Sequence, residues 1–200
     1  VTAPAGEMKT TTTGSTTTYE KCLNHQWRNT SGTGGDTVTK TCDLCGTTDM
    51  GGAVAKLNNG DVYTTLAAAI TAAAAAENST VQLLNDVTTT GTIRVASGTF
   101  TLDLNGKTWN GTADDTLQVD SGGNVTVTST NGVGTITCSQ NNAICVGHGA
   151  TVHVKSGVRL NQLYAMTDAK LTLDVGVIIT GKFFTKTENI APFLAGKALQ

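Results

Sequence analysis

Arginine is scarce in this 200-residue chain, which contains only Arg28, Arg94 and Arg159. All charged residues together make up 14% of the sequence, against a typical value of about a quarter. The formal net charge is −2. A surface that binds nucleic acid needs basic side chains to neutralise phosphates, so this composition argues against a nucleic-acid partner.

Long apolar segments are also lacking. The longest one, residues 66–76, consists mainly of alanine and is too short and too weakly hydrophobic to cross a bilayer. We therefore expect no membrane span. Because Val1 is not an initiator methionine, we interpret the chain as a mature protein whose signal peptide has been removed, and we expect it to be secreted.

A short motif recurs along the second half of the chain. It consists of an apolar–polar–apolar strand that ends at a glycine, and it occupies residues 102–106, 125–132, 152–157 and 171–176. The first apolar positions of these copies are Leu102, Val125, Val152 and Leu171. A spacing of roughly two dozen positions is typical of a solenoid, in which each unit buries its apolar edge on the next. We predict an all-β fold, a right-handed parallel β-helix.

The composition between the repeats agrees with this fold. From Thr80 onward, short alternating segments are separated by Asn and Gly residues, which tolerate the backbone of tight corners. Threonine supplies roughly one residue in five and suits exposed strand faces. A β-sandwich would also have many short strands, but recurrence of one motif favours the solenoid.

Three regions separate along the chain: residues 1–20, 21–52 and 53–200. The first is Thr-rich and of low complexity, and we interpret it as a linker or as a strand donated to a neighbouring subunit. The second contains three of the five cysteines, and the third contains the β-helix. In the third region, residues 54–57 and 61–63 predict a hairpin around the turn at 58–60.

An amphipathic helix is predicted at residues 65–77. Leu66, Ala69, Ile70 and Ala73 fall on one face of it, and Thr64 or Thr65 can cap its start. A solenoid must cover the apolar end of its core. We therefore expect this helix to be the N-terminal lid of the β-helix.

Residues 63–70, 79–87 and 101–108 carry a family resemblance. Together they resemble the opening of pectate-lyase-like β-helical domains in secreted, cell-surface proteins of Gram-positive bacteria, many of them from the gut. The tail at 189–199 is similar to a segment that often follows the last coil in such proteins. The resemblance implies an extracellular β-helix but no particular activity, because this fold hosts lyases, adhesins and structural stalks.

Four residues in the second region have the spacing of a metal site. They form a C-x2-H pair and a C-x2-C pair, namely Cys22 with His25 and Cys42 with Cys45. Zinc takes four tetrahedral nitrogen or sulfur ligands, so these residues predict a closed, structural zinc site. The same surface proteins often carry a similar module, which here matches Cys22, His25, Trp27, Thr41, Cys42, Cys45 and Gly46. Disulfides remain an alternative in an oxidising compartment, and a redox C-x-x-C is disfavoured because no strand–motif–helix unit surrounds Cys42.

The other two cysteines, Cys138 and Cys145, flank a turn at residues 139–142. They are either a local disulfide across a corner of the β-helix or two small buried residues.

Catalytic residues are not evident in the sequence. Lyases on this fold need a basic residue beside acids that bind calcium and the uronate carboxylate. The candidates here are scattered: Asp114, Asp115, His148, His153, Lys155, Arg159, Asp168 and Asp174. We therefore expect no enzymatic activity. Sugar binding without chemistry needs aromatic platforms; aromatic residues are 4% of the chain, and Trp109 and Tyr164 are the best candidates.

We expect a structural or adhesive surface module, with a carbohydrate-binding module or a degenerate polysaccharide lyase as alternatives. The C-terminal end of the solenoid has no second amphipathic helix, so we expect it to be covered either by residues 189–200 or by a neighbouring copy. Head-to-tail contacts of this kind lead to filaments, to which residues 9–18 would add a strand.

Overall fold

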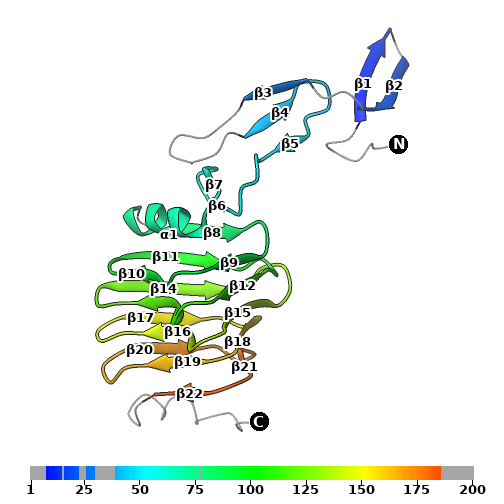
Figure 1. The fold of residues 1–200 in the computed structure, drawn as a ribbon. Helices are drawn as coiled ribbons and strands as arrows, with labels where there is room; N and C mark the ends of the chain where they lie inside the picture. Colours follow the sequence, from blue (N-terminus) through cyan, green and yellow to red (C-terminus); the bar gives the residue numbers. More distant parts are fainter. Residues whose placement is uncertain (1–7, 15, 23–25, 30–38, 77, 186–200) are drawn as a thin grey trace.

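The chain forms an all-β parallel solenoid of about four turns, preceded by a small three-stranded sheet and a hairpin (Figure 1). This computed structural model describes residues 8–14, 16–22, 26–29, 39–76 and 78–185. Within them there is a single helix, α1 (Leu66–Ala75). The predicted fold class, a parallel β-solenoid with one helix and a cysteine cluster in front, is confirmed.

Each turn of the solenoid contributes one strand to each of three parallel sheets. The first sheet contains β8 (Ser79–Leu83), β11 (Gly98–Asp103), β14 (Gly123–Thr128), β17 (Thr151–Val154) and β20 (Lys170–Leu173). The second contains β9 (Val87–Thr89), β12 (Thr108–Gly111), β15 (Gly134–Cys138), β18 (Val158–Leu160) and β21 (Ile178–Ile179). The third contains β10 (Ile93–Val95), β13 (Asp115–Val119), β16 (Asn142–Val146), β19 (Leu163–Ala165) and β22 (Phe183–Phe184).

The core consists of apolar side chains stacked in columns from turn to turn. In the first sheet, Leu102 of β11 pairs with Val81 on one side and Val127 on the other, and Val127 pairs with Val154. These four side chains are all fully buried. Because strand side chains alternate between the two faces, the apolar–polar–apolar motif places two residues of each strand in the core and one outside.

The pairing corrects the first interval of the sequence repeat. Val125 pairs with Phe100 and not with Leu102, so the first interval of the repeat begins two positions earlier than the motif indicates. Phe100 and Leu102 lie on the same face of β11. Apolar periodicity alone cannot choose between them, because a shift of two keeps every side chain on its own face.

The outward face of the first sheet explains the high threonine content. Thr80, Thr101 and Thr126 pair in register on three successive strands. The column continues through His153 to Thr172. β-branched side chains with a polar tip satisfy both the strand backbone and the solvent at these positions.

The N-terminal end of the solenoid is covered as predicted. β6 (Ala55–Leu57) and β7 (Val62–Tyr63) form the expected hairpin, and β6 pairs antiparallel with β8. Helix α1 follows, with its N-cap at Thr65 and its C-cap at Ala76. Its buried residues are Leu66, Ala69, Ile70 and Ala73, which join the solenoid core.

The Thr-rich segment pairs with itself. β1 (Met8–Thr13) and β2 (Thr16–Lys21) form an antiparallel hairpin. Its turn contains Gly14, whose φ of 62° lies in the left-handed region that favours glycine. The high β-propensity of threonine is thus satisfied within the chain, which neither interpretation of this segment anticipated.

The last turn of the solenoid is less well buried than the others. Leu171, Leu173 and Ile179 are only half-buried, although they occupy inward columns that are fully buried one turn earlier. The predicted closure of this end by residues 189–200 lies outside the described residues.

Asp103 is a buried carboxylate that joins three successive turns. Its side chain is 3% exposed and accepts four hydrogen bonds. The donors are Asn105 N (2.8 Å), Thr130 N (3.0 Å), Thr130 Oγ1 (2.7 Å) and Gln82 Nε2 (2.9 Å). Burial opposes ionisation, but the hydrogen bonds from Gln82 and Thr130 outweigh it, and the pKa of Asp103 lies below its usual value.

We predict that Asp103→Asn lowers the free energy of unfolding by about 1–3 kcal/mol at pH 7, because an amide cannot accept all four hydrogen bonds. A carboxyl group whose pKa is depressed on folding stabilises the protein above its unfolded pKa of about 3.9, and this contribution is lost as the pH falls. The difference between wild type and Asp103→Asn should therefore shrink as the pH is lowered from neutral through that unfolded pKa. Urea denaturation measures it, with exposed Asp114→Asn as the control that changes little.

Candidate functional site

Three thiols converge in the small module in front of the solenoid. The Sγ atoms of Cys22, Cys42 and Cys45 all lie within 4.8 Å of one another. Cys22 Sγ and Cys42 Sγ are 3.8 Å apart, and both residues are buried, while Cys45 is half-buried. This group could hold a metal ion, because thiolates are strong ligands for soft and borderline cations.

The local backbone positions these thiols. β3 (Trp27–Asn29), β4 (Lys40–Cys42) and β5 (Thr48–Asp49) form an antiparallel sheet, and Cys42 is the last residue of β4. A tight turn follows, in which Gly46 N donates to Cys42 O at 2.8 Å. Gly46 has a φ of 72°, in the left-handed region that favours glycine. The turn returns Cys45 to the side of Cys42.

The surroundings of the thiols shift their pKa values, and a bound cation would stabilise their thiolate forms. Burial, together with hydrogen bonds to Cys45 and Cys42, raises the pKa of Cys22 to about 12. The hydrogen bond between Cys45 Sγ and Thr47 Oγ1 (3.2 Å) lowers the pKa of Cys45. A bound divalent cation would favour the thiolate form of each. The fourth predicted ligand, His25, lies outside the described residues.

Cys138 and Cys145 are free and buried in this structure, so they do not form the disulfide that was one of the two interpretations. Cys138 Sγ donates to the carbonyl oxygens of Ala113 (3.1 Å) and Asp114 (3.3 Å) in the preceding turn. Burial, reinforced by Asp115, raises the pKa of Cys145 to about 11.

The residues considered for lyase chemistry are spread over different parts of the solenoid. His148 Nδ1 lies 2.5 Å from Asp168 Oδ1, at a corner between the third and the first sheet. His153 Nε2 lies 2.7 Å from Asp174 Oδ1 on the first sheet. Arg159 is exposed on β18 of the second sheet. The hydrogen bond with His148 lowers the pKa of Asp168.

The prediction that Trp109 contacts glycans is wrong. Trp109 lies on β12 in the inward column with Val87 and Ile136, and it is completely buried. Its indole Nε1 donates to Thr89 Oγ1 at 2.9 Å. Tyr164, the other predicted contact, is 37% exposed on β19.

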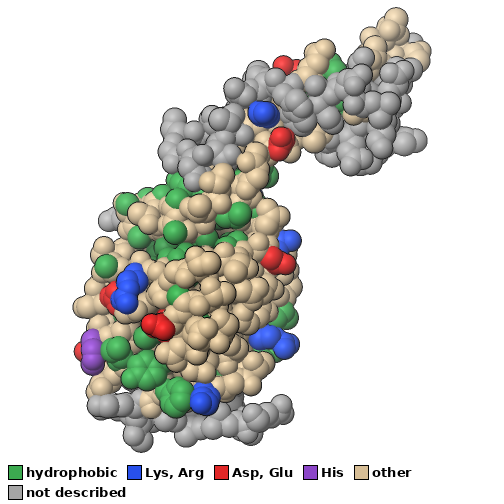
Figure 2. All heavy atoms as spheres, viewed as in Figure 1, with side chains coloured by type: hydrophobic (Ala, Val, Ile, Leu, Met, Phe, Trp, Pro, Cys, Tyr) green, Lys and Arg blue, Asp and Glu red, His purple; other side chains and the backbone are tan. Residues whose placement is uncertain are grey.

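The outward face of the third sheet contains a second candidate site. Arg94, Gln118, Cys145, Tyr164 and Phe184 pair in register on five successive strands. At the C-terminal end of this column, Tyr164 and Phe184 have ring centroids 6.3 Å apart and planes inclined at 56°. Figure 2 shows hydrophobic side chains gathered at this end of the solenoid on the face in view.

An open depression of about 330 Å³ lies beside the two rings. Its lining residues are Asp115, Asn141, Asn142, Cys145, Tyr164 and Phe184. Of these, Tyr164 was anticipated as a glycan contact, and Asp115 was among the acidic residues considered for lyase chemistry. The lining residues come from four successive turns, and the turn-to-turn register brings them together.

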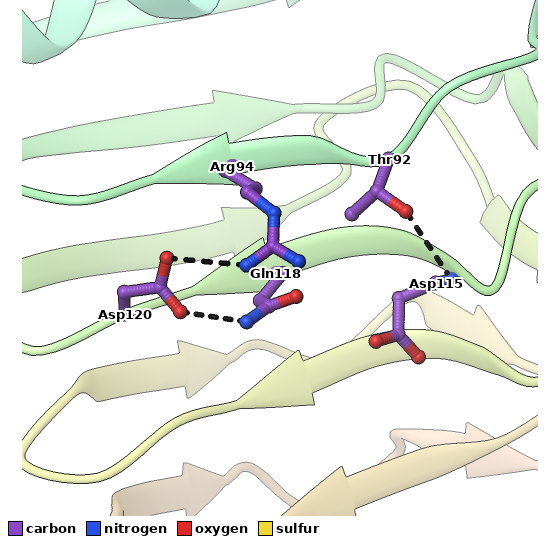
Figure 3. A network of polar contacts seen from close by, with 5 residues as sticks. All are labelled: Thr92, Arg94, Asp115, Gln118 and Asp120. Carbon is purple, nitrogen blue, oxygen red and sulfur yellow. Dashed lines mark hydrogen bonds and ion pairs between the residues drawn. The ribbon is translucent and has the colours of Figure 1, made fainter.

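Hydrogen bonds order the polar side of this face. Asn142 Nδ2 donates to Asp115 Oδ1 (2.8 Å), and Gln162 Nε2 donates to Asn142 Oδ1 (3.1 Å). Nearer the N-terminal end, Asp120 accepts from Gln118 Nε2 (2.7 Å) and pairs with Arg94 (3.6 Å). Figure 3 shows these groups around Asp120, and the Asp115 backbone N that donates to Thr92 Oγ1 at 3.4 Å.

No protein-family model matches this chain, and no curated protein or solved structure matches it either. In the described part of the chain, no helix has both the length and the apolar character needed to cross a membrane.

We predict that the full chain binds one Co²⁺ through thiolates, visible as sulfur-to-cobalt charge-transfer absorption. Cys45→Ser should reduce the intensity of this band and weaken binding at least about tenfold, because one thiolate ligand is lost. Cys145→Ser is the matched control, since Cys145 is buried in the solenoid away from the cluster. A Cys145→Ser protein that loses the band, or a Cys45→Ser protein that keeps it unchanged, contradicts the assignment.

Proposed function

We propose that this chain is a non-enzymatic, extracellular structural or adhesive module, in which a small zinc-bound domain precedes a β-solenoid. The observation that carries the proposal is the continuous in-register stack of the three sheets. Such a stack holds outward side chains at fixed positions over a long surface, which suits contact with another surface. The resemblance to β-helical cell-surface proteins of Gram-positive bacteria supports the same function.

Zinc is the metal that best fits the cluster in the small domain. Three thiolates favour zinc over the hard cations calcium and magnesium. The C-x2-H spacing makes His25 the fourth ligand that we propose, and four protein ligands leave no position for substrate. We therefore assign the zinc a structural role.

The placement of the charged residues supports the absence of catalysis. A polysaccharide lyase needs a base close to carboxylates, whereas Arg159 lies on the second sheet and Asp115 on the third. The His153–Asp174 pair belongs to the first sheet, and the His148–Asp168 pair lies at a corner between the third sheet and the first. No described constellation therefore combines a base, an acid and an anion-binding group at one point.

Self-association is a further part of the proposal. Within the described residues, β20, β21 and β22 are each the last strand of their sheet, and the inward side chains of this turn are half-buried. A second copy of the chain would cover both the strand edges and these side chains. Donation of β1 to a neighbour would require the hairpin with β2 to open first.

We predict that chelation removes one equivalent of zinc and leaves the solenoid folded. A solenoid is stabilised by contacts between neighbouring turns, and the cluster lies outside it. Circular dichroism should show an almost unchanged melting transition, while the thiols of Cys22, Cys42 and Cys45 become reactive towards an alkylating agent. Cooperative unfolding of the whole chain on chelation would contradict the modular arrangement.

We also predict no unsaturated product from polygalacturonate, with or without added calcium, because among the described residues Arg159 and Asp115 lie on different sheets. The assay follows ultraviolet absorbance of the unsaturated uronate. The assay uses purified wild-type chain at high concentration. Activity that disappears in Arg159→Ala would overturn the non-enzymatic proposal.

A further inference from the structure

We propose that the depression beside Tyr164 and Phe184 binds a neutral, hydroxyl-rich sugar of an oligosaccharide. This inference rests on the proposed adhesive function and names the chemistry of its ligand. It places the binding site on the outward face of the third sheet, at the C-terminal end of the solenoid.

The aromatic pair is the first argument. Among the aromatic side chains whose burial the structure describes, Tyr63, Phe100 and Trp109 are buried and Phe183 is half-buried. The two exposed ones, Tyr164 (37%) and Phe184 (45%), are neighbours on adjacent strands. Exposed aromatic rings that gather at one place mark an interaction site, and their faces carry partial negative charge that attracts the C–H groups of a pyranose ring.

The polar groups next to the rings are the second argument. A sugar presents hydroxyl groups at its edge once one ring face is stacked, so its site needs both donors and acceptors there. The Asp115 carboxylate offers about four lone-pair positions, and the hydrogen bond that Asn142 Nδ2 donates to Asp115 Oδ1 occupies only part of them. Asn141 is exposed at the same rim and adds an amide that both donates and accepts. This combination of an apolar platform with a few fixed polar groups is typical of small-molecule sites.

The hydrogen bonds within the face hold these groups in place before a ligand arrives. Asn142 is buried, and its amide is fixed by Asp115 on one side and Gln162 on the other. Each of these residues lies on, or directly next to, a strand of the rigid stack. Little side-chain freedom is therefore lost when a ligand binds, which favours affinity for a small ligand.

The negative charge of the lining disfavours binding of an acidic sugar. The charged lining residue is the carboxylate Asp115. Arg94 lies on β10, the strand next to that of Asp115, and already pairs with Asp120, while Lys182 is exposed just before β22 and is not a lining residue. A uronate carboxylate in the depression would meet Asp115 without a neutralising cation among the lining residues. The lining therefore selects neutral sugars by repulsion of acidic ones. The volume of about 330 Å³ lies at the lower end of the usual range for ligand pockets and fits one or two sugar rings.

The test uses the full, zinc-loaded chain and a defined set of oligosaccharides. Cellohexaose, xylohexaose, mannohexaose and chitohexaose are the neutral probes, and hexagalacturonate is the acidic one. Saturation-transfer NMR and isothermal titration calorimetry should show binding of at least one neutral probe and none of hexagalacturonate. Tyr164→Ala and Phe184→Ala should each weaken that binding about tenfold or more.

Ile178→Ala is the matched control. Ile178 is 40% exposed on β21, at the same end of the solenoid but on the second sheet, so its replacement should leave binding unchanged. Melting curves establish that each variant is folded. The proposal is overturned if no neutral probe binds, if hexagalacturonate binds more tightly, or if the two aromatic variants behave like the control. Zinc content and lyase activity are measured independently of these binding experiments. Failure of the glycan assignment can therefore be distinguished from failure of the proposed function.

Discussion

The solenoid and its surface sites depend on the register between one turn and the next. An isolated turn exposes the apolar edges of its short strands, and only a neighbour in the correct register covers them. Val125 and Val127, for example, are buried because β11 and β17 flank their strand on both sides. The two ends of the stack are therefore its weak points. Helix α1 solves the problem at the N-terminal end, where its alanines allow a close approach to the first turn.

The same register distributes the polar chemistry. Because the core admits almost only apolar residues, the polar groups lie at corners and on outward faces, where successive turns place them in columns. Where a polar group is buried, hydrogen bonds satisfy it, as the four hydrogen bonds from three turns do for Asp103. Columns also explain how a chain so poor in aromatic residues presents two of them together. A full turn of chain separates Tyr164 from Phe184, yet the two residues pair directly on adjacent strands.

Local patterns predicted the elements well and the surface poorly. Alternation, turn residues and one helical face were enough to locate β11, β14, β17 and β20 of the first sheet, the hairpin at 54–63 and helix α1 close to their observed bounds. The cysteine pair spacing brought Cys22, Cys42 and Cys45 together correctly. In contrast, the burial of Trp109 depends on which face of β12 points inward. An aromatic residue between two polar ones is compatible with either orientation of the strand, so the sequence alone does not predict this burial. The depression was missed because the intervals along its column, which runs through positions 94, 118, 145, 164 and 184, are unequal and depend on corner lengths.

The direction of the hydrogen bonds between turns has a mechanical consequence. These bonds run along the solenoid axis, since each sheet pairs strands from successive turns. Tension between the two ends of the solenoid therefore opens one turn at a time and does not shear all of them together. The half-buried last turn yields first, and each released turn adds roughly 80 Å of extended chain. An attachment built in this way lengthens stepwise under load, while the turns that remain stacked keep their shape.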